Sequence, residues 1–336
     1  MSAKAISRSG KVNADTMQKF LAFSGLVLLY VIFSVITPNF FSLNNTIDIM
    51  RASAVQGVMA LGGTFVIITG GIDLSLGTVM TFSSVIMGIM VADMGVPVWL
   101  GLIACVLTGA ICGLANGFFI AKMKIPPFIA TLGMMMITRG LSLATTGANN
   151  KYFTDYPNFR LIANGSIVDS AIKAINPNWS VPVPNAVLIL FGMAILGHLI
   201  LTKTVFGRYT FAMGSNEEAT RLSGVNTAAW KMGVYTLCGA FTGVAGILMA
   251  SRLNSAQVAQ GAGMELDAFA AVVIGGTSMS GGEGTILGTI IGALLMNVLL
   301  NGLRISMISQ EWQWVATGVI VIGAVYMDIV RRRKRG

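Results

Sequence analysis

Long apolar runs recur along almost the whole chain and are separated by short polar segments. Most of these runs approach the roughly 20 residues that an α-helix needs to cross the hydrocarbon core of a bilayer. Because lipid offers no hydrogen-bond partners to the backbone, such runs predict transmembrane helices. Ten candidate spans follow: 20–36, 52–69, 76–91, 98–120, 127–145, 186–201, 230–250, 266–276, 285–303 and 314–329. We therefore expect an all-α integral membrane protein with about ten transmembrane helices in a single domain over residues 1–336.

The charges predict how these spans are oriented. Only 10% of the residues are charged, against about 25% in soluble domains. Most lysines and arginines gather in a few segments, and such enrichment marks the cytoplasmic side of a membrane protein. We expect cytoplasmic segments at 1–19, 202–229 and in the basic tail 330–336, and a periplasmic loop at 148–185. The tail serves as a topology anchor or attracts anionic lipid. The net charge of +9 is then topological, and no nucleic-acid partner is expected.

Two glycine pairs interrupt the apolar runs, at Gly70-Gly71 and at Gly275-Gly276. Such pairs favour helix breaks, and Asp73 and Ser75 are able to cap the helix that follows the first break. The span 266–276 is short and ends in glycines, a pattern typical of backbone that lines a cavity or is covered by protein. Broken or re-entrant segments are therefore expected at both places.

The polar stretch GRYTFAMGSNEEATRLSGVN, residues 207–226, carries the signature of a short helix of about two turns. Asn216 is a favourable N-cap, and the carboxylates of Glu217 and Glu218 complement the helix dipole in the first turn. Gly224 supplies a C-terminal stop after Arg221. A short capped helix between two apolar segments is expected to dock on a partner.

This helix also carries a family resemblance. Glu218-Ala219-Thr220, followed after three residues by Gly224, resembles the E-A-A-x-x-x-G loop of ATP-binding-cassette (ABC) importer permeases, with Thr220 in place of the usual alanine. TGGIDLSLGT (69–78) and ELDAFAAVVIGGTSMSGGEGTILGTIIGALL (265–295) are similar to the permeases of bacterial ribose-type importers. The resemblance extends from about residue 37 to residue 328.

The resemblance implies a multi-pass permease of the bacterial inner membrane with three protein partners. An ABC ATPase would hold the coupling residues in a groove, and these are Asn216, Glu217, Glu218, Ala219, Arg221 and Gly224. A periplasmic sugar-binding protein would dock on the outer face, where the loop 148–185 carries mixed charges and a helical pattern from Ile167 to Ile175. A second permease copy, as in a homodimer, would complete the pathway.

No set of residues predicts catalysis, so the chain is not expected to be an enzyme. The phosphate-binding motif G-x-x-x-x-G-K-[ST] is absent from the sequence, so ATP would be bound by the partner subunit and no cofactor is expected. Cys105, Cys112 and Cys238 lie in apolar runs and are interpreted as small core residues, and one histidine, His198, does not make a metal site.

Polar residues within apolar spans are the candidates for a translocation path, because burying them in hydrocarbon is costly. These candidates are Asp73, Ser75, Asn116, Arg139, Asp267, Asn297 and Asn301. For the asparagines, the alternative is ordinary hydrogen bonding between helices. Arg139 is expected to face the protein interior or a water-filled cavity, because an arginine at depth in lipid costs several kcal/mol.

A second class of function stays open, an ion-coupled secondary transporter with substrate bound at the two broken helices. It has no need for a capped docking helix, and few membrane carboxylates offer a proton relay. A membrane scaffold without transport is disfavoured by the polar residues in the spans. The transported sugar, ribose or a related monosaccharide, is left open by the sequence.

Overall fold

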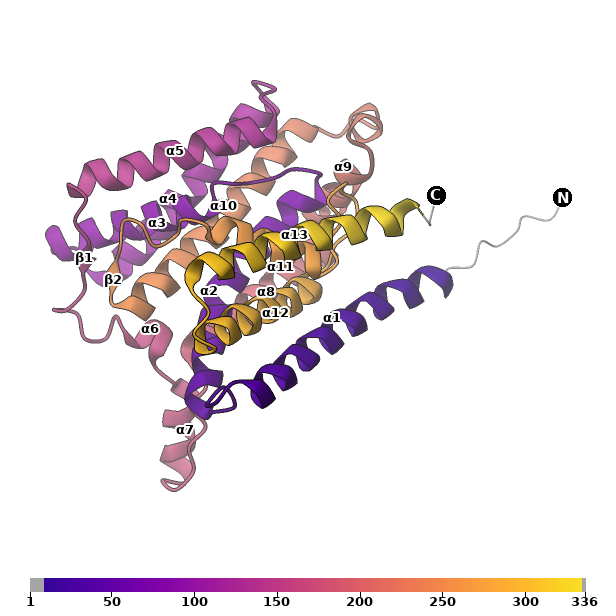
Figure 1. Cartoon of the computed structure of the whole chain (residues 1–336). Helices are drawn as coiled ribbons and strands as arrows, with labels where there is room; N and C mark the ends of the chain where they lie inside the picture. The colour runs from indigo at the N-terminus through magenta and orange to yellow at the C-terminus, as the bar shows by residue number, and fades with distance from the viewer. Residues whose placement is uncertain (1–8, 334–336) are drawn as a thin grey trace.

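A computed structural model gives the structure of residues 9–333, which form a bundle of helices (Figure 1). The first half contains α1 Ser9–Ile36, α2 Leu43–Ile68, α3 Leu76–Gly88 with its π-helical continuation η1 Ile89–Asp93, α4 Val98–Ala121, α5 Pro127–Thr146, α6 Leu161–Asn164 and α7 Ile167–Ile175. The second half contains α8 Asn185–Lys203, α9 Val205–Leu222, α10 Thr227–Leu253, α11 Met264–Ile274, α12 Ile286–Ile305 and α13 Gln310–Arg333. The short strands β1 Lys151–Tyr152 and β2 Ser255–Ala256 pair antiparallel.

The expected all-α membrane architecture is confirmed. Seven helical segments within residues 9–333 are long and apolar enough to cross a membrane, namely α2, α3 with η1, α4, α5, α8, α10 and α12. Every one of the ten expected spans coincides with a helix, but the count of ten transmembrane helices stays a prediction. The span predicted at 266–276 is only the 11-residue helix α11, about 16 Å long, and a bilayer core is about 30 Å thick.

Helix α2 is the centre of the bundle. Its surroundings include α8, α10, α11 and α12, and almost its whole length is buried. The most extensive helix pair is α4 with α10, because glycines on both helices allow the backbones to touch. A Cβ atom on Gly109 would lie 2.2 Å from the carbonyl oxygen of Gly239, so only glycine fits there. Close contacts between glycines therefore hold α4 and α10 together. Cys105, Cys112 and Cys238 are buried in it, as predicted.

The two ends of the bundle differ. Helix α9, the beginning of α1 and the last turn of α13 lie at one end, which we call the α9 end, while α6, α7 and the two strands lie at the other (Figure 1). The helix predicted around Ile167–Ile175 is present as α7, capped by the Ser166 hydroxyl, which accepts from the Asp169 amide at 3.1 Å. Its contact with a membrane surface stays a prediction. Of the predicted basic segments, residues 1–8 and 334–336 lie outside the described residues.

Candidate functional site

The predicted docking helix is present as the second part of α9. Asn216 interrupts α9 with extended backbone (φ −163°, ψ 100°), and its side-chain oxygen accepts from the Ala219 amide at 2.9 Å. Gly224 has a φ of +85°, the left-handed conformation expected for a C-terminal stop. The structure therefore confirms the N-cap hydrogen bond of Asn216 and the left-handed conformation of Gly224. We refer to residues 216–224 as the docking helix.

The charges of the docking helix are held by two ion pairs. Glu218 pairs with Arg221 at 2.6 Å on the exposed side, and hydrogen bonding to Arg221 lowers the pKa of Glu218. Glu217 pairs with Lys231 of α10 at 2.6 Å and so fastens the helix to the bundle. Leu222, at the last turn, is 76% exposed. An exposed apolar residue beside a charged pair is suited to contact with a second protein.

The residues before Asn216 form a contact that the sequence reasoning missed. A Cβ atom on Gly214 would lie 1.8 Å from the carbonyl oxygen of Ile68, at the end of α2. The same carbonyl accepts from the Gly282 amide at 2.8 Å, and Gly282 has a φ of +77°. A Cβ atom on Gly282 would in turn meet the hydroxyl of Ser215 at 2.7 Å.

The end of α2, the loop 275–285 and residues 214–215 of α9, directly before the docking helix, thus meet at one place, which we call the glycine joint. The joint includes Gly214 of the stretch 207–226 and Gly281 and Gly282 of the motif 265–295. The backbone nitrogen of Gly70, in the motif 69–78, lies 3.0 Å from a Cβ atom built on Gly281. Glycine occurs in all three motifs, and this could have indicated the glycine joint. The spacing of glycines alone, however, does not show which segments contact each other.

The helix break after α2 places three path candidates in one buried cluster. Asp73 accepts from the backbone amide of Ser75 at 2.9 Å and from its hydroxyl at 2.6 Å, and Asn116 of α4 donates to that hydroxyl at 3.0 Å. Ser75 does precede α3, but its side chain makes no cap hydrogen bond, which corrects that expectation. Its hydroxyl is occupied by Asp73 and Asn116 instead. This cluster joins α3 to α4, the interhelical role that was the alternative for Asn116.

The asparagines of α12 lie apart from that cluster. The amide of Asn297 donates to the side-chain oxygen of Gln56 in α2 and to the Ala293 carbonyl at 2.8 Å. Asn301, one turn further on, has a buried side-chain oxygen without a hydrogen-bond partner in residues 9–333. Asn297 therefore also holds two helices together.

Arg139 of α5 is exposed and lines a narrow hollow of about 30 Å³. Thr78 and Thr81 of α3 form its other wall, together with residues of the segment after β2. Arg139 thus lies beside hydroxyl groups of a neighbouring helix. Its orientation relative to lipid stays a prediction.

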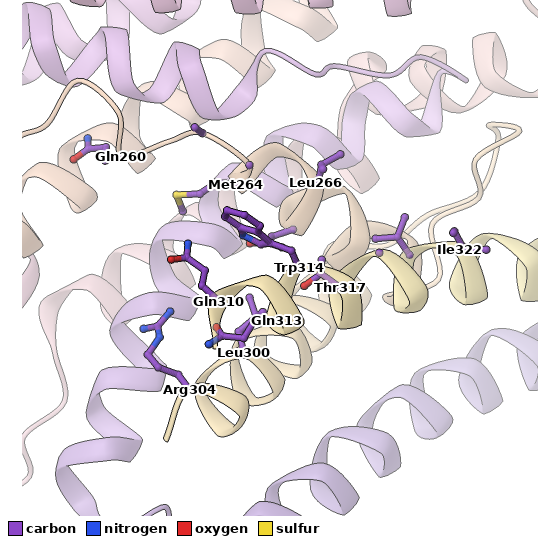
Figure 2. Close-up of a pocket in the computed structure, with 15 residues that line it drawn as sticks. Gln260, Met264, Leu266, Leu300, Arg304, Gln310, Gln313, Trp314, Thr317 and Ile322 are labelled. Carbon is purple, nitrogen blue, oxygen red and sulfur yellow. The ribbon is translucent and has the colours of Figure 1, made fainter. Parts of the chain in front are cut away.

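A cavity of about 1080 Å³ lies between α11, α12 and α13 and is shown in Figure 2. Asp267 of α11 lines it, and its carboxylate has no hydrogen-bond or ion-pair partner in the described part of the chain. Across from α11, the beginning of α13 contributes Gln310, Gln313 and Trp314, and α12 contributes Arg304. Of the predicted candidates, Asp267 is the one that lies in a sizeable cavity.

The seven helical segments within residues 9–333 that are long and apolar enough to cross a bilayer indicate a multi-pass membrane protein. The family model described as the permease component of a branched-chain amino acid transport system matches residues 45–325. The chain belongs to this permease family.

Relatives cover almost the full length. The chain is 40% identical to the ribose import permease RbsC of Bacillus subtilis over 93% of each chain. It is 39% identical to the ribose import permease RbsC of Escherichia coli K12, over 90% of this chain and 91% of the relative. It is 35% identical to the fructose import permease FrcC of Rhizobium meliloti, over 90% and 83%. No solved structure matches the chain.

Proposed function

We propose that this chain is the membrane-spanning permease subunit of an ATP-driven importer that carries a monosaccharide across the bacterial inner membrane. The observation that carries the proposal is the docking helix, an exposed capped helix that directly follows the glycine joint. The relatives that import ribose and fructose support the choice of a monosaccharide.

The energy source is a separate subunit. The sequence has no phosphate-binding loop, so we propose that an ABC ATPase receives the docking helix in a groove. The exposed Glu218–Arg221 pair and Leu222 supply charged and apolar contacts for that groove. The α9 end is then cytoplasmic, and within residues 9–333 α1 begins and α13 ends on that side.

The opposite end would receive the sugar from a periplasmic binding protein. Helix α7 and the loops around it form that end, and Asp169 pairs with Lys173 at 2.6 Å on its surface. Mixed charges of this kind suit a transient contact. We further propose a homodimer whose pathway lies between two copies, with α11 and α12 near the two-fold axis.

Reconstitution tests the proposal. The permease is purified with the ATPase and binding protein that accompany it, placed in liposomes, and tested for uptake of D-ribose, D-fructose and D-xylose. We expect uptake of one of these sugars that requires ATP and all three components. The alternative, an ion-coupled secondary transporter, would instead show uptake by the permease alone, driven by a sodium or proton gradient.

A further inference from the structure

The cavity between α11, α12 and α13 combines an aromatic face, side-chain amides and a carboxylate that has no hydrogen-bond or ion-pair partner within residues 9–333. We propose that this cavity is a low-affinity monosaccharide-binding site within the permease itself, which holds the sugar after the binding protein releases it. The inference rests on the proposed function and adds to it a defined place and a defined set of contacts.

Trp314 supplies the aromatic face. Its side chain is 66% exposed, and Figure 2 shows the indole ring extending from α13 toward Met264 of α11. The adjacent Gln313 is buried, and its amide donates to the Ile308 carbonyl at 2.8 Å, which fixes this turn of α13. The indole therefore stands on a fixed turn with its face free. The apolar C–H face of a sugar ring stacks on such a surface, while the ring edge is left for hydrogen bonds.

Asp267 supplies the acceptor. The side chain is half buried, and no donor in residues 9–333 satisfies its carboxylate. Leaving such a group unpaired in an apolar surrounding is costly, so a polar ligand or water is expected there. Two neighbouring hydroxyl groups of a monosaccharide donate to the two oxygens of one carboxylate, and such charge-assisted hydrogen bonds are the stronger ones.

Gln310 and Arg304 complete the set. Both point into the cavity in Figure 2, from the beginning of α13 and the end of α12. The glutamine amide both donates and accepts, and the guanidinium only donates, so hydroxyl and ring oxygens of a sugar both find partners. Aliphatic side chains, among them Leu266, Leu300 and Ile322, form the rest of the lining.

The size of the cavity predicts weak binding. Ligand pockets that enclose their ligand measure about 300 to 1,000 Å³, and this cavity of about 1080 Å³ slightly exceeds that range. A single monosaccharide leaves part of it filled by water. Weak binding suits a transport path, because a site must release what it binds.

Uptake measurements in the reconstituted complex test the contacts. We expect Trp314→Ala and Asp267→Asn each to lower the initial rate of uptake about tenfold, and Trp314→Phe to retain at least about half of it, because phenylalanine keeps an aromatic face. The matched control is Trp312→Ala. Trp312 is also 66% exposed, but it does not line the cavity, so uptake should match the wild type. Each variant is normalised to the amount inserted and to the ATPase bound.

Protection from labelling tests the location without disturbing these contacts. Gln310→Cys lies in the cavity, and Glu311→Cys is an exposed neighbour outside it. The three native cysteines are buried and stay in place. In the assembled complex, the transported sugar should slow the reaction of Gln310→Cys with a small maleimide at least threefold. It should leave Glu311→Cys unchanged, as should sucrose at the same osmolarity for both variants.

The outcomes separate this inference from the proposed function. If the wild-type complex imports none of the tested sugars in an ATP-dependent manner, the proposed function is wrong. If the wild type imports a sugar while Trp314→Ala and Asp267→Asn keep its rate, or while Gln310→Cys is not protected, the cavity is not the sugar site. Slowed transport in Trp312→Ala to the same extent as in Trp314→Ala would also contradict the inference.

Discussion

Gly224 ends the docking helix in a left-handed conformation, with φ +85°, and a Cβ atom built on it meets nothing within 4 Å. Substitution therefore acts through the backbone and not through a clash. An L-residue in this conformation costs about 1 to 2 kcal/mol, and a β-branched residue is especially unfavourable there. Gly224→Val should relieve this strain by changing φ, which tilts the chain between the docking helix and α10. Asparagine tolerates the left-handed region, so Gly224→Asn is the matched control.

The expected loss follows from these energies. If the valine variant must recover the native turn to bind the ATPase, the strain of about 1 to 2 kcal/mol weakens binding roughly 5- to 30-fold. The measurement is titration of nanodiscs that contain the permease with the purified ATPase, followed by sugar-stimulated ATP hydrolysis. We expect Gly224→Val to insert normally and to bind the ATPase more weakly, while Gly224→Asn stays within about twofold of the wild type. Equal binding by both variants would refute the role given to this turn.

Three further predictions concern the same assembly. Glu218→Lys should break the pair with Arg221 and abolish association with the ATPase, measured by co-purification, while membrane insertion stays unchanged. If this variant shows full sugar uptake that still requires the ATPase, the docking site lies elsewhere. Because Arg221 lowers the pKa of Glu218, the contribution of this pair is present at neutral pH and is lost only in acid as the carboxylate protonates, so association should be constant between about pH 6 and about pH 8. Leu266→Cys on α11 should cross-link two permease copies in membranes, whereas Leu196→Cys on α8 should not, and purified active complexes with a single permease chain would contradict the homodimer.

The helices could be predicted from the sequence because apolar length alone requires them. The N-cap and the C-terminal stop of the docking helix could be predicted, because Asn216 and Gly224 act on the backbone of their own segment. Contacts between distant segments could not be predicted in this way. Ser75 is an example: its local pattern indicates a cap, but Asn116, on another helix, donates to its hydroxyl.

The candidate path residues show the same limit. All seven are polar residues in or beside apolar spans, yet the structure buries Asp73, Asn116 and Asn297 in contacts between helices and leaves Asp267 in a large cavity. Gln310, Gln313 and Trp314 were missed because they precede or begin the last apolar span, where polar and aromatic residues are common. The feature that distinguishes them is their position opposite α11, which depends on the fold.

The glycine joint gives the docking helix a mechanical connection to the cavity. Gly214 contacts the end of α2 and the loop 275–285 at distances that leave no room for a side chain, and this loop follows α11 directly. The opposite end of α11 carries Asp267 into the cavity. Close-packed backbone transmits displacement because it has no free volume in which to absorb it. A shift of the docking helix that passes through the break at Asn216 to Gly214 would either open the joint or move α11. As a short helix between two loops, α11 has fewer contacts to resist such a shift than α2.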